Sequence, residues 1–468
     1  MKYFKIIAQL FLLTLVQSAV AQESSVYIDV GQATTKKSLL ALTPFQYFGT
    51  QASNPTHIQA GQELYRVIYN DLNVSNFFAF VKPDAYLEDP NKVGLKPAPG
   101  APNGFNFASW KPLGTEFLVR GGYKVVGDTF DFEVYVYHVG TAKLVMGKNY
   151  KGTLNSLRRM AHTFSNDLVK ALTGRKGMFT SKIVASRQIQ SGSGSNSKFS
   201  EKEIYIMDWD ANNPQKITSH NSIAISPTWS NKGDRIAYTA FALHKTQKVR
   251  NADLFIYDLT TGKRWLVSYK KGLNSGAAFL PGDQQLLLTL TQGGNADIYR
   301  MNADGAGLTQ LTKGPSGALN VEPAISPDGK VIAFSSDRSG RPMIYLMNSD
   351  GSGPRRLTFV GKYNASPAWS PDGKQIAFAG YDQDHFDIFV MNADGSNIRR
   401  LTDAKKTNGR NSNNESPSWS PDGRHIAFAS DRTGKYQIYL VNPDGTNERR
   451  LTNDLYNWDK PKWSPFLD

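Results

Sequence analysis

The sequence contains no cysteine among its 468 residues. A chain without cysteine forms no disulfide, so burial alone must hold the fold together. After the N-terminus it also has no apolar run long enough to cross a membrane. No sustained block of lysine or arginine occurs either, although the formal net charge is +14. The scattered charge therefore predicts solubility and modest electrostatic steering rather than nucleic-acid binding.

Patterns that would indicate catalysis are missing too. There is no Gly-x-Ser-x-Gly elbow, and residues 191–197 resemble one only in composition. The seven histidines show no metal-ligand spacing, and His162 falls in a predicted helix, where a structural role is the simpler interpretation. Each Asp-Gly pair stands alone in a hairpin, which favours turn formation over calcium binding. We therefore expect no catalytic residue, no cofactor and no metal site.

The N-terminus is typical of a secretory signal peptide covering residues 1–21. Lys2 and Lys5 supply the positive start, residues 6–16 form an apolar stretch, and small residues end at Ala21. The alternative, a buried N-terminal helix, fits less well because polar, charge-poor sequence follows at once. We expect cleavage after Ala21, export to the periplasm and, since no cysteine is available for lipid attachment, a soluble mature chain.

An internal repeat indicates the architecture. Residues 366–373 and 416–423 share the pattern Ser-Pro-x-Trp-Ser-Pro-Asp-Gly, and weaker copies occur elsewhere. The six copies centre on Trp229, Phe279, Ile325, Trp369, Trp419 and Trp463. Their spacings of 50, 46, 44, 50 and 44 residues match the period of a β-propeller blade of four short strands.

The two ends of the repeat region complement each other. A pattern typical of the third strand of a blade occurs six times, at Ile204, Leu254, Ile298, Ile344, Ile388 and Ile438. The last copy, residues 459–466, has only a first strand, and residues 182–218 supply the three strands that it lacks. We therefore predict a six-bladed all-β propeller over residues 181–468, closed by pairing of the C-terminal strand with residues 182–186.

Residues 34–175 carry no copy of the repeat and predict a separate α/β domain. Residues 56–72 and 155–172 have helical apolar spacing, and Gly174 follows as a C-terminal cap. Residues 116–119 and 130–139 alternate as strands do. The chain is thus expected to be a two-domain protein, with the α/β domain ahead of the propeller.

The geometry of a propeller predicts where a partner binds. Within a blade of strands A to D, the A–B and C–D turns share one face, and the D–A and B–C connections share the other. Here the first set is short and uniform, while the second varies in length and content, as binding loops do. The predicted contact residues are Leu273, Asn274, Gly276, Asn320, Glu322, Tyr363, Asn364, Asn414, Glu415 and Trp458. The alternative is that about half of them only close their own loops.

A second partner segment is predicted at the mature N-terminus. Within residues 22–33, Val26 and Ile28 alternate with Tyr27 and Asp29. A short alternating segment at a free end can pair with the sheet edge of another protein. The spacing by itself favours the other interpretation, a first strand of the α/β domain.

Several stretches taken together resemble one family. They are Val26-Tyr27-Ile28-Asp29, Pro44-Phe45, Leu157-Arg158-Arg159-Met160-Ala161-His162 and Leu172-Thr173-Gly174-Arg175-Lys176-Gly177-Met178-Phe179. With the propeller repeat, this combination resembles the TolB family, periplasmic components of the Tol–Pal system of Gram-negative bacteria.

The resemblance implies a non-catalytic adaptor that supports outer-membrane integrity and constriction at cell division. It implies that a Pal-like peptidoglycan-associated lipoprotein docks on the propeller face and that a TolA-like inner-membrane protein binds residues 22–33. We expect a monomer that reaches membranes only through these partners and binds no nucleic acid.

Two other functions stay open. A cell-wall carbohydrate-binding propeller would also use the aromatic residues of the loops. A propeller hydrolase or lyase is less well supported, because a peptidase needs a further domain with a Ser-Asp-His set and a lyase needs clustered metal ligands at the channel.

Overall fold

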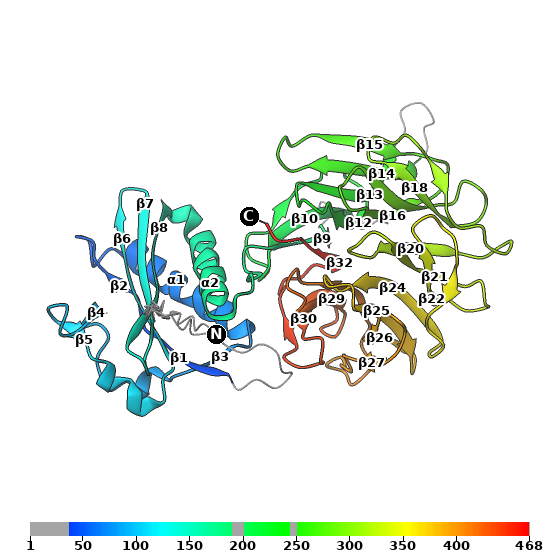
Figure 1. Cartoon of the computed structure of the whole chain (residues 1–468). Helices are drawn as coiled ribbons and strands as arrows, with labels where there is room; N and C mark the ends of the chain where they lie inside the picture. Colours follow the sequence, from blue (N-terminus) through cyan, green and yellow to red (C-terminus); the bar gives the residue numbers. More distant parts are fainter. Residues whose placement is uncertain (1–36, 190–200, 244–249, 468) are drawn as a thin grey trace, which may run out of the picture. The chain divides into compact units, whose positions relative to one another are not determined.

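The computed structural model describes residues 37–189, 201–243 and 250–467 (Figure 1). The predicted signal peptide and the segment 22–33, with Val26, Tyr27, Ile28 and Asp29, lie outside these residues. The chain divides into two compact units, one formed by Met1–Leu157 with Leu168–Arg175 and the other by Arg158–Asp167 with Lys176–Asp468. Within the described ranges, no helix is both long enough and apolar enough to cross a membrane.

The first unit is built on a mixed sheet. Its strand order is β3 (Phe78–Phe80), β1 (Ser38–Leu42), β6 (Phe117–Val126), β7 (Thr129–His138) and β8 (Lys143–Thr153), and the short strand β2 (Gln46–Tyr47) also pairs with β6. β1 runs parallel to both β3 and β6, whereas β6, β7 and β8 form an antiparallel meander. The smaller strands are β2 (Gln46–Tyr47), β4 (Gly94–Pro97) and β5 (Gly104–Phe105). The alternating apolar residues of β7 are fully buried, which confirms the predicted strand.

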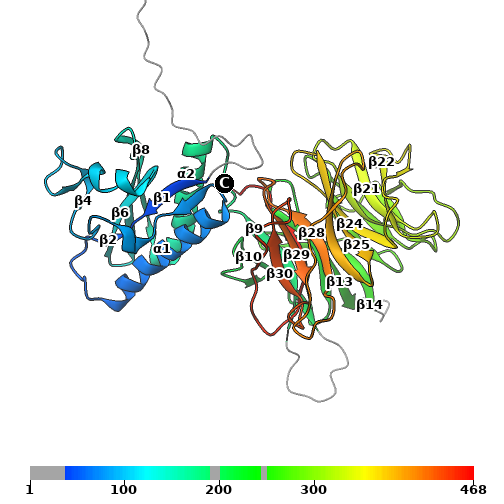
Figure 2. The same ribbon diagram turned by 90° about the horizontal axis from the view of Figure 1, so that it is seen from below.

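The described residues contain two α-helices. α1 (Pro55–Val74) begins at Asn54, whose side chain accepts a hydrogen bond from the Thr56 amide at 2.9 Å. It lies along one face of the sheet and contacts β3 and β6 (Figure 2). α2 (Leu157–Thr173) ends at Gly174, which takes a positive φ of 70° and donates to the carbonyl of Lys170. Its predicted apolar stripe is buried throughout. Four 3₁₀ turns are η1 (Pro83–Ala85), η2 (Phe107–Ser109), η3 (Lys111–Leu113) and η4 (Leu154–Ser156).

The second unit contains six four-stranded sheets, the blades of a propeller. In the order A to D, the first three blades are β12 (Ala224–Trp229), β13 (Arg235–Leu243), β14 (Arg250–Asp258), β15 (Arg264–Ser268); β16 (Asn274–Phe279), β17 (Gln285–Leu290), β18 (Asp297–Asn302), β19 (Thr309–Gln310); and β20 (Asn320–Ile325), β21 (Val331–Ser336), β22 (Met343–Asn348), β23 (Arg355–Arg356). The other three are β24 (Tyr363–Trp369), β25 (Gln375–Asp382), β26 (His385–Asn392), β27 (Arg399–Arg400); β28 (Asn414–Trp419), β29 (Ile426–Ser430), β30 (Gln437–Val441), β31 (Arg449–Arg450); and β32 (Trp458–Trp463), β9 (Lys182–Gln188), β10 (Lys202–Asp208), β11 (Gln215–Lys216).

The ring closes as the sequence predicts. β32, the last strand of the chain, pairs antiparallel with β9, and Trp463 lies opposite Ile183. Each A strand contacts the A strand of the next blade, and β32 in turn contacts β12. The C-terminal segment therefore supplies strand A of a blade whose other three strands come from the start of the propeller.

The repeated tryptophan joins neighbouring blades. The indole Nε1 of Trp369 donates to the carbonyl of Ala324 at 3.1 Å, and that of Trp419 donates to Ala368 at 3.0 Å. Trp229 makes the same contact across the seam, to the carbonyl of Lys462 at 3.0 Å. A large side chain with one polar atom suits this position, because its ring fills the space between two sheets and its N–H finds an acceptor in the next blade.

Candidate functional site

A ring of six backbone irregularities surrounds the propeller axis. Every A strand has a β-bulge, in which two residues lie opposite one residue of strand B. The first residue of each bulge takes a positive φ between 51° and 66°. These six residues, which we call the bulge ring, are Ser226, Gly276, Glu322, Ser366, Ser416 and Lys460. All six line a central channel of about 870 Å³.

Two members of the bulge ring form an ion pair. The ammonium of Lys460 lies 3.1 Å from Oε1 of Glu322. The other oxygen of Glu322 accepts hydrogen bonds from the amide of Ser366 at 2.7 Å and from its hydroxyl at 2.9 Å. Burial favours the neutral carboxyl, but the Lys460 ammonium and these bonds outweigh it and lower the pKa of Glu322. Glu322 in turn raises the pKa of Lys460, so both groups are charged at neutral pH.

Exposed apolar side chains gather on one face of the propeller. We define the loop face by the six D–A connections, residues 217–223, 269–273, 311–319, 357–362, 401–413 and 451–457. In the described propeller, the large exposed apolar residues other than Leu266 lie in these connections or, for Tyr363, directly after one. They are Tyr269, Leu319, Phe359, Val360, Tyr363 and Leu455, of which Leu455 is 87% exposed and Phe359 71%. Several exposed apolar side chains on one face are a feature of protein-binding surfaces.

The structure divides the predicted contact residues into two groups. Asn274, Asn320, Asn364, Asn414 and Trp458 are buried, each with at most 2% of its surface exposed. Their side chains hold neighbouring backbone and side chains: Asn414, for example, donates to Asp387 at 2.9 Å and accepts from Arg432 at 3.0 Å. A buried amide with its bonds satisfied positions a loop. We expect these five to affect a partner only through the loops that they hold.

The remaining predicted residues are accessible. Leu273, Gly276, Glu322 and Tyr363 line the channel. Glu415 accepts a hydrogen bond from the hydroxyl of Tyr436 at 2.8 Å. Their contact with a partner stays a prediction. The sequence analysis did not predict the exposed apolar residues of the D–A connections. A large apolar residue that follows the Leu-Thr pair at the start of a connection is a signal that could have found Leu319, Phe359 and Leu455.

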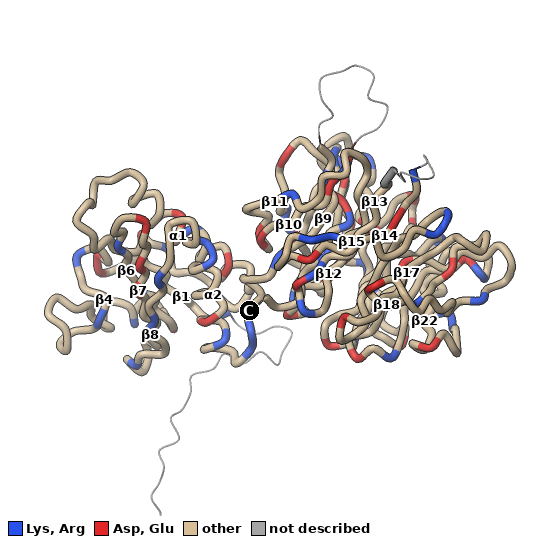
Figure 3. The backbone as a smooth tube through the Cα atoms, turned by 90° about the horizontal axis from the view of Figure 1, so that it is seen from above, with Lys and Arg blue, Asp and Glu red and all other residues tan. Residues whose placement is uncertain are grey.

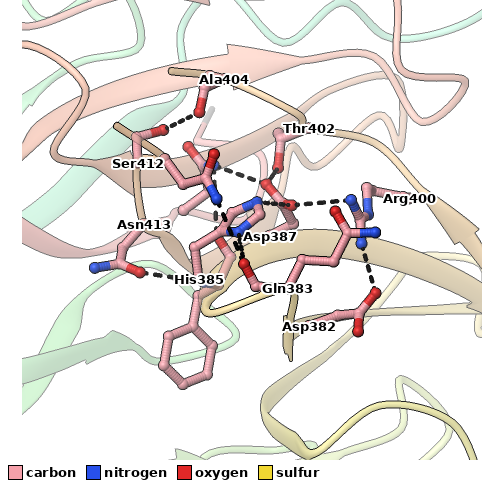
Figure 4. A network of polar contacts seen from close by, with 12 residues as sticks. Asp382, Gln383, His385, Asp387, Arg400, Thr402, Ala404, Ser412 and Asn413 are labelled. Carbon is pink, nitrogen blue, oxygen red and sulfur yellow. Dashed lines mark hydrogen bonds and ion pairs between the residues drawn. The ribbon is translucent and has the colours of Figure 1, made fainter. Parts of the chain in front are cut away.

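One blade carries a compact polar cluster at the B–C end of β26 (Figure 4). The ring of His385 lies between the carbonyl of Gln383, 3.0 Å from Nδ1, and the carboxylate of Asp387, 2.9 Å from Nε2 (Figure 4). Burial raises the pKa of Asp387 despite its bonds to Thr402 and Asn414. The hydroxyl of Ser412 donates to the carbonyl of Ala404 at 2.7 Å instead of to the imidazole. The cluster therefore lacks the serine–histidine bond that a hydrolase site needs.

A repeated contact explains why an acid stands at Asp387. In each of five blades, the hydroxyl of a threonine after strand D accepts a hydrogen bond from the amide of the central C-strand residue, as Thr402 does from Ile388 at 3.0 Å. In three of these blades the same hydroxyl donates to an acidic side chain of the residue just before that C-strand residue. Thr402, for example, donates to Asp387, which precedes Ile388, at 2.8 Å. Asp387 thus belongs to the propeller repeat.

A group of three potential metal ligands occurs in the described residues, formed by His162, Asp208 and Asp210. The carboxylate of Asp208 already binds the Lys182 ammonium at 2.7 Å, and Arg158 binds Asp210. Two cationic side chains thus compensate the carboxylates, so this group is better explained as an ion-pair network than as a cation site.

Charges of both signs are interspersed along the described chain (Figure 3). Charge therefore does not set the loop face apart from the rest of the surface, whereas its exposed apolar side chains do.

Comparison with known proteins identifies the family. Residues 169–467 match the family described as "TolB beta propeller domain", and residues 26–145 match "TolB amino-terminal domain". The chain belongs to the TolB family. It is 33% identical over 288 residues to "Tol-Pal system protein TolB" of Desulfosudis oleivorans, an alignment that covers 61% of this chain and 60% of that relative. It is 34% identical over 308 residues to "Protein TolB homolog" of Chlorobium chlorochromatii, covering 66% and 63%.

The alignments thus span about three fifths of these curated relatives. The crystal structure of TolB from Acinetobacter baumannii shares the fold, with a TM-score of 0.73 at 23% identity over 94% of this chain and 100% of that one. The predicted resemblance to the TolB family and the predicted two-domain fold are therefore confirmed.

Proposed function

We propose that this TolB-family chain is a periplasmic, non-catalytic adaptor of the Tol–Pal system that docks a Pal-like peptidoglycan-associated lipoprotein on its loop face. Its membership of the TolB family and the names of its relatives, Tol-Pal system proteins, support a role in the Tol–Pal system. The observation that supports the docking surface is that four D–A connections, which share one face, carry exposed apolar side chains. A rigid ring presents these side chains on one face, which limits the ordering cost of binding.

The adaptor acts by holding two partners at once. The loop face binds the lipoprotein, and the segment 22–33, with Val26, Tyr27, Ile28 and Asp29, binds a TolA-like inner-membrane protein by adding a strand to its sheet. Linking an envelope-spanning protein to a peptidoglycan-bound one supports outer-membrane integrity and constriction at cell division. Export through the signal peptide delivers the chain to the compartment where both partners are accessible.

The docking surface is tested by calorimetric titration with the soluble domain of the lipoprotein from the same organism. Leu455→Asp combined with Phe359→Asp places two charges where we expect apolar contacts and should weaken binding at least about 100-fold. Leu87→Asp is the matched control, because Leu87 is 63% exposed but lies in the first unit. Equal affinity of the double variant and the wild-type chain would refute the proposed surface.

The second partner is tested separately. Deleting residues 22–33 from the mature chain should abolish binding of the TolA-like protein and leave lipoprotein binding unchanged. Retained TolA binding after the deletion would remove the role assigned to this segment.

A cell-wall carbohydrate-binding propeller remains the second candidate, because Tyr269, Phe359 and Tyr363 are exposed aromatic rings on the same face. Titration with muropeptides in parallel separates the two: saturable muropeptide binding without lipoprotein binding would replace the adaptor by this function.

A further inference from the structure

The propeller channel contains a lysine without a counterion. Three charged residues line the channel, Glu322, Lys460 and Lys462, and the rest of its described lining is uncharged. Lys460 and Glu322 form the ion pair described above. Across the described part of the chain, the ammonium of Lys462 makes neither an ion pair nor a hydrogen bond, so the channel carries one uncompensated positive charge.

The position of Lys462 is exceptional within the repeat. It is the residue directly after the bulge in β32, where it lies opposite Val184. The equivalent residues of the other five A strands also line the channel, and all are small: Thr228, Ala278, Ala324, Ala368 and Ser418. Five blades thus leave room around the axis, and the sixth extends a long cationic side chain into it. Packing alone does not call for a lysine here, because five smaller residues satisfy the same position.

Glu322 attracts Lys462 electrostatically but forms its ion pair with Lys460 instead. One of its oxygens binds Lys460 at 3.1 Å, and the other accepts two bonds from Ser366 at 2.7 and 2.9 Å. The carboxylate is therefore engaged at both oxygens. Any negative charge that compensates Lys462 must come from outside the described chain.

The surroundings strengthen the attraction of Lys462 for an anion. Tryptophan rings of several blades, among them Trp369 and Trp419, line the same channel and keep its local dielectric low. Burial, with the neighbouring Lys460, lowers the pKa of Lys462 to about 8, so the side chain is still mostly protonated at neutral pH. The side chain is half-buried, and a bound anion would compensate its charge there.

We propose that the channel is a binding site for a single carboxylate, with Lys462 as its cation. The size of the charge selects the ligand class, because one free ammonium balances a monoanion, whereas a phosphate or sulfate dianion would leave charge uncompensated in a low-dielectric channel. Serine and threonine hydroxyls of the lining, from Ser416, Ser418 and Thr228, offer further donors to a carboxylate. The site does not depend on which partner docks at the loop face.

The full mature chain is titrated with acetate at constant ionic strength, with N-acetyl-glutamate amide as a second probe and N-acetyl-glutamine amide as its uncharged match. Lys462→Met keeps the length of the side chain and removes the charge, and Lys462→Arg restores the charge. Lys232→Met is the control, because Lys232 is exposed at an A–B turn and its loss changes the net charge equally. The readouts are the acetate-dependent shift in Tm and the apparent pKa of Lys462 followed by NMR of ¹³C-methylated lysines.

The proposal predicts saturable acetate binding with a Kd of about 1–10 mM, typical of one ion pair in a partly dry site. Acetate should raise the apparent pKa of Lys462 by linkage, and affinity should fall as the pH exceeds about 8. Lys462→Met should weaken acetate binding at least about tenfold, while Lys462→Arg and Lys232→Met should bind acetate as the wild-type chain does.

Tighter binding of the glutamate probe than of acetate would point to an acidic side chain of a protein partner, and preference for acetate would point to a free small carboxylate. Both results support the site. An acetate response that is equal in the wild-type chain and Lys462→Met, or absent from the wild-type chain with both probes, would overturn it.

Discussion

Replacing Trp463 by alanine should open the propeller at its seam. The side chain is 6% exposed, and its indole Nε1 donates to the hydroxyl of Ser181 at 2.7 Å. Removing a buried tryptophan costs about 3–5 kcal/mol, and losing its hydrogen bond adds about 1 kcal/mol. Because Trp463 pairs with β9 in the closing sheet, most of this loss should appear as separation of β32 from β9.

Native-state hydrogen exchange measures that separation directly. A loss of about 4 kcal/mol corresponds to a nearly thousandfold faster exchange of amides that are exposed by the opening. We expect this acceleration in β9 and β32, including the amide of Ser464, which donates to the carbonyl of Lys182 at 2.8 Å. The other blades should exchange as in the wild-type chain.

Trp419→Ala is the matched control for Trp463→Ala. Trp419 occupies the same place in its blade, is 7% exposed and donates to the carbonyl of Ala368. Its loss should cost a similar free energy, with faster exchange in β28 and little change in β9. If both variants accelerate exchange uniformly around the ring, the seam is not a separate opening unit and the reasoning fails.

Three further substitutions test other parts of the structure. Lys462→Met should raise the free energy of unfolding at about pH 7 by up to about 3 kcal/mol, because the folded state holds the lysine pKa at about 8, below its ordinary 10.5. The destabilisation by Lys462 is complete below pH 8 and decreases as the pH rises towards 10.5. The free energies of unfolding of the wild-type chain and the variant, measured with urea, should therefore converge at high pH. Asn414→Ala should lower the free energy of unfolding by about 2–3 kcal/mol, because Asp387 and Arg432 each lose a hydrogen bond. An unchanged melting temperature would contradict the positioning role of Asn414. Gly351→Ala should lower the free energy of unfolding by about 1–3 kcal/mol more than Gly340→Ala. Both glycines have a positive φ, but only at Gly351 would the new Cβ lie 2.6 Å from the carbonyl oxygen of Leu311. Equal melting temperatures of the two variants would refute this.

The propeller could be predicted from the sequence because its information is local and repeated. Each blade carries its own strand pattern and Asp-Gly turns, so six weak signals support one another. The incomplete copies at the two ends predict the pairing of β32 with β9, which the structure confirms. Helix limits were close as well, since the capping glycine Gly174 marks the end of α2.

Strand D is shorter than its sequence pattern predicts. The stretch 399–402 of one blade predicts a strand, but β27 covers only Arg399–Arg400. The amide of Leu401 still donates to the carbonyl of Ile388 at 2.8 Å, but the amide of Ile388 donates to the hydroxyl of Thr402 at 3.0 Å in place of a backbone carbonyl. A side chain that substitutes for a strand contact cannot be recognised from alternation alone.

The site was harder to predict because exposure depends on distant neighbours. Asparagine is a frequent surface residue, yet Asn320 and Asn414 are buried, since acids of other strands and arginines of B–C connections satisfy their amides. The partner of Glu322 is Lys460, 138 positions away in the chain, and no local pattern joins them. The bulge ring had a weak signal, because a proline follows the bulge residue in five of the six A strands.

We propose that the loop face binds the lipoprotein. Hydrogen exchange of the mature chain with and without the soluble domain of the lipoprotein tests this most directly. The account predicts slower exchange in the D–A connections 311–319, 357–362 and 451–457, with the C–D turns on the opposite face unchanged. Protection confined to those C–D turns or to the first unit, or no protection at saturating lipoprotein, would contradict it.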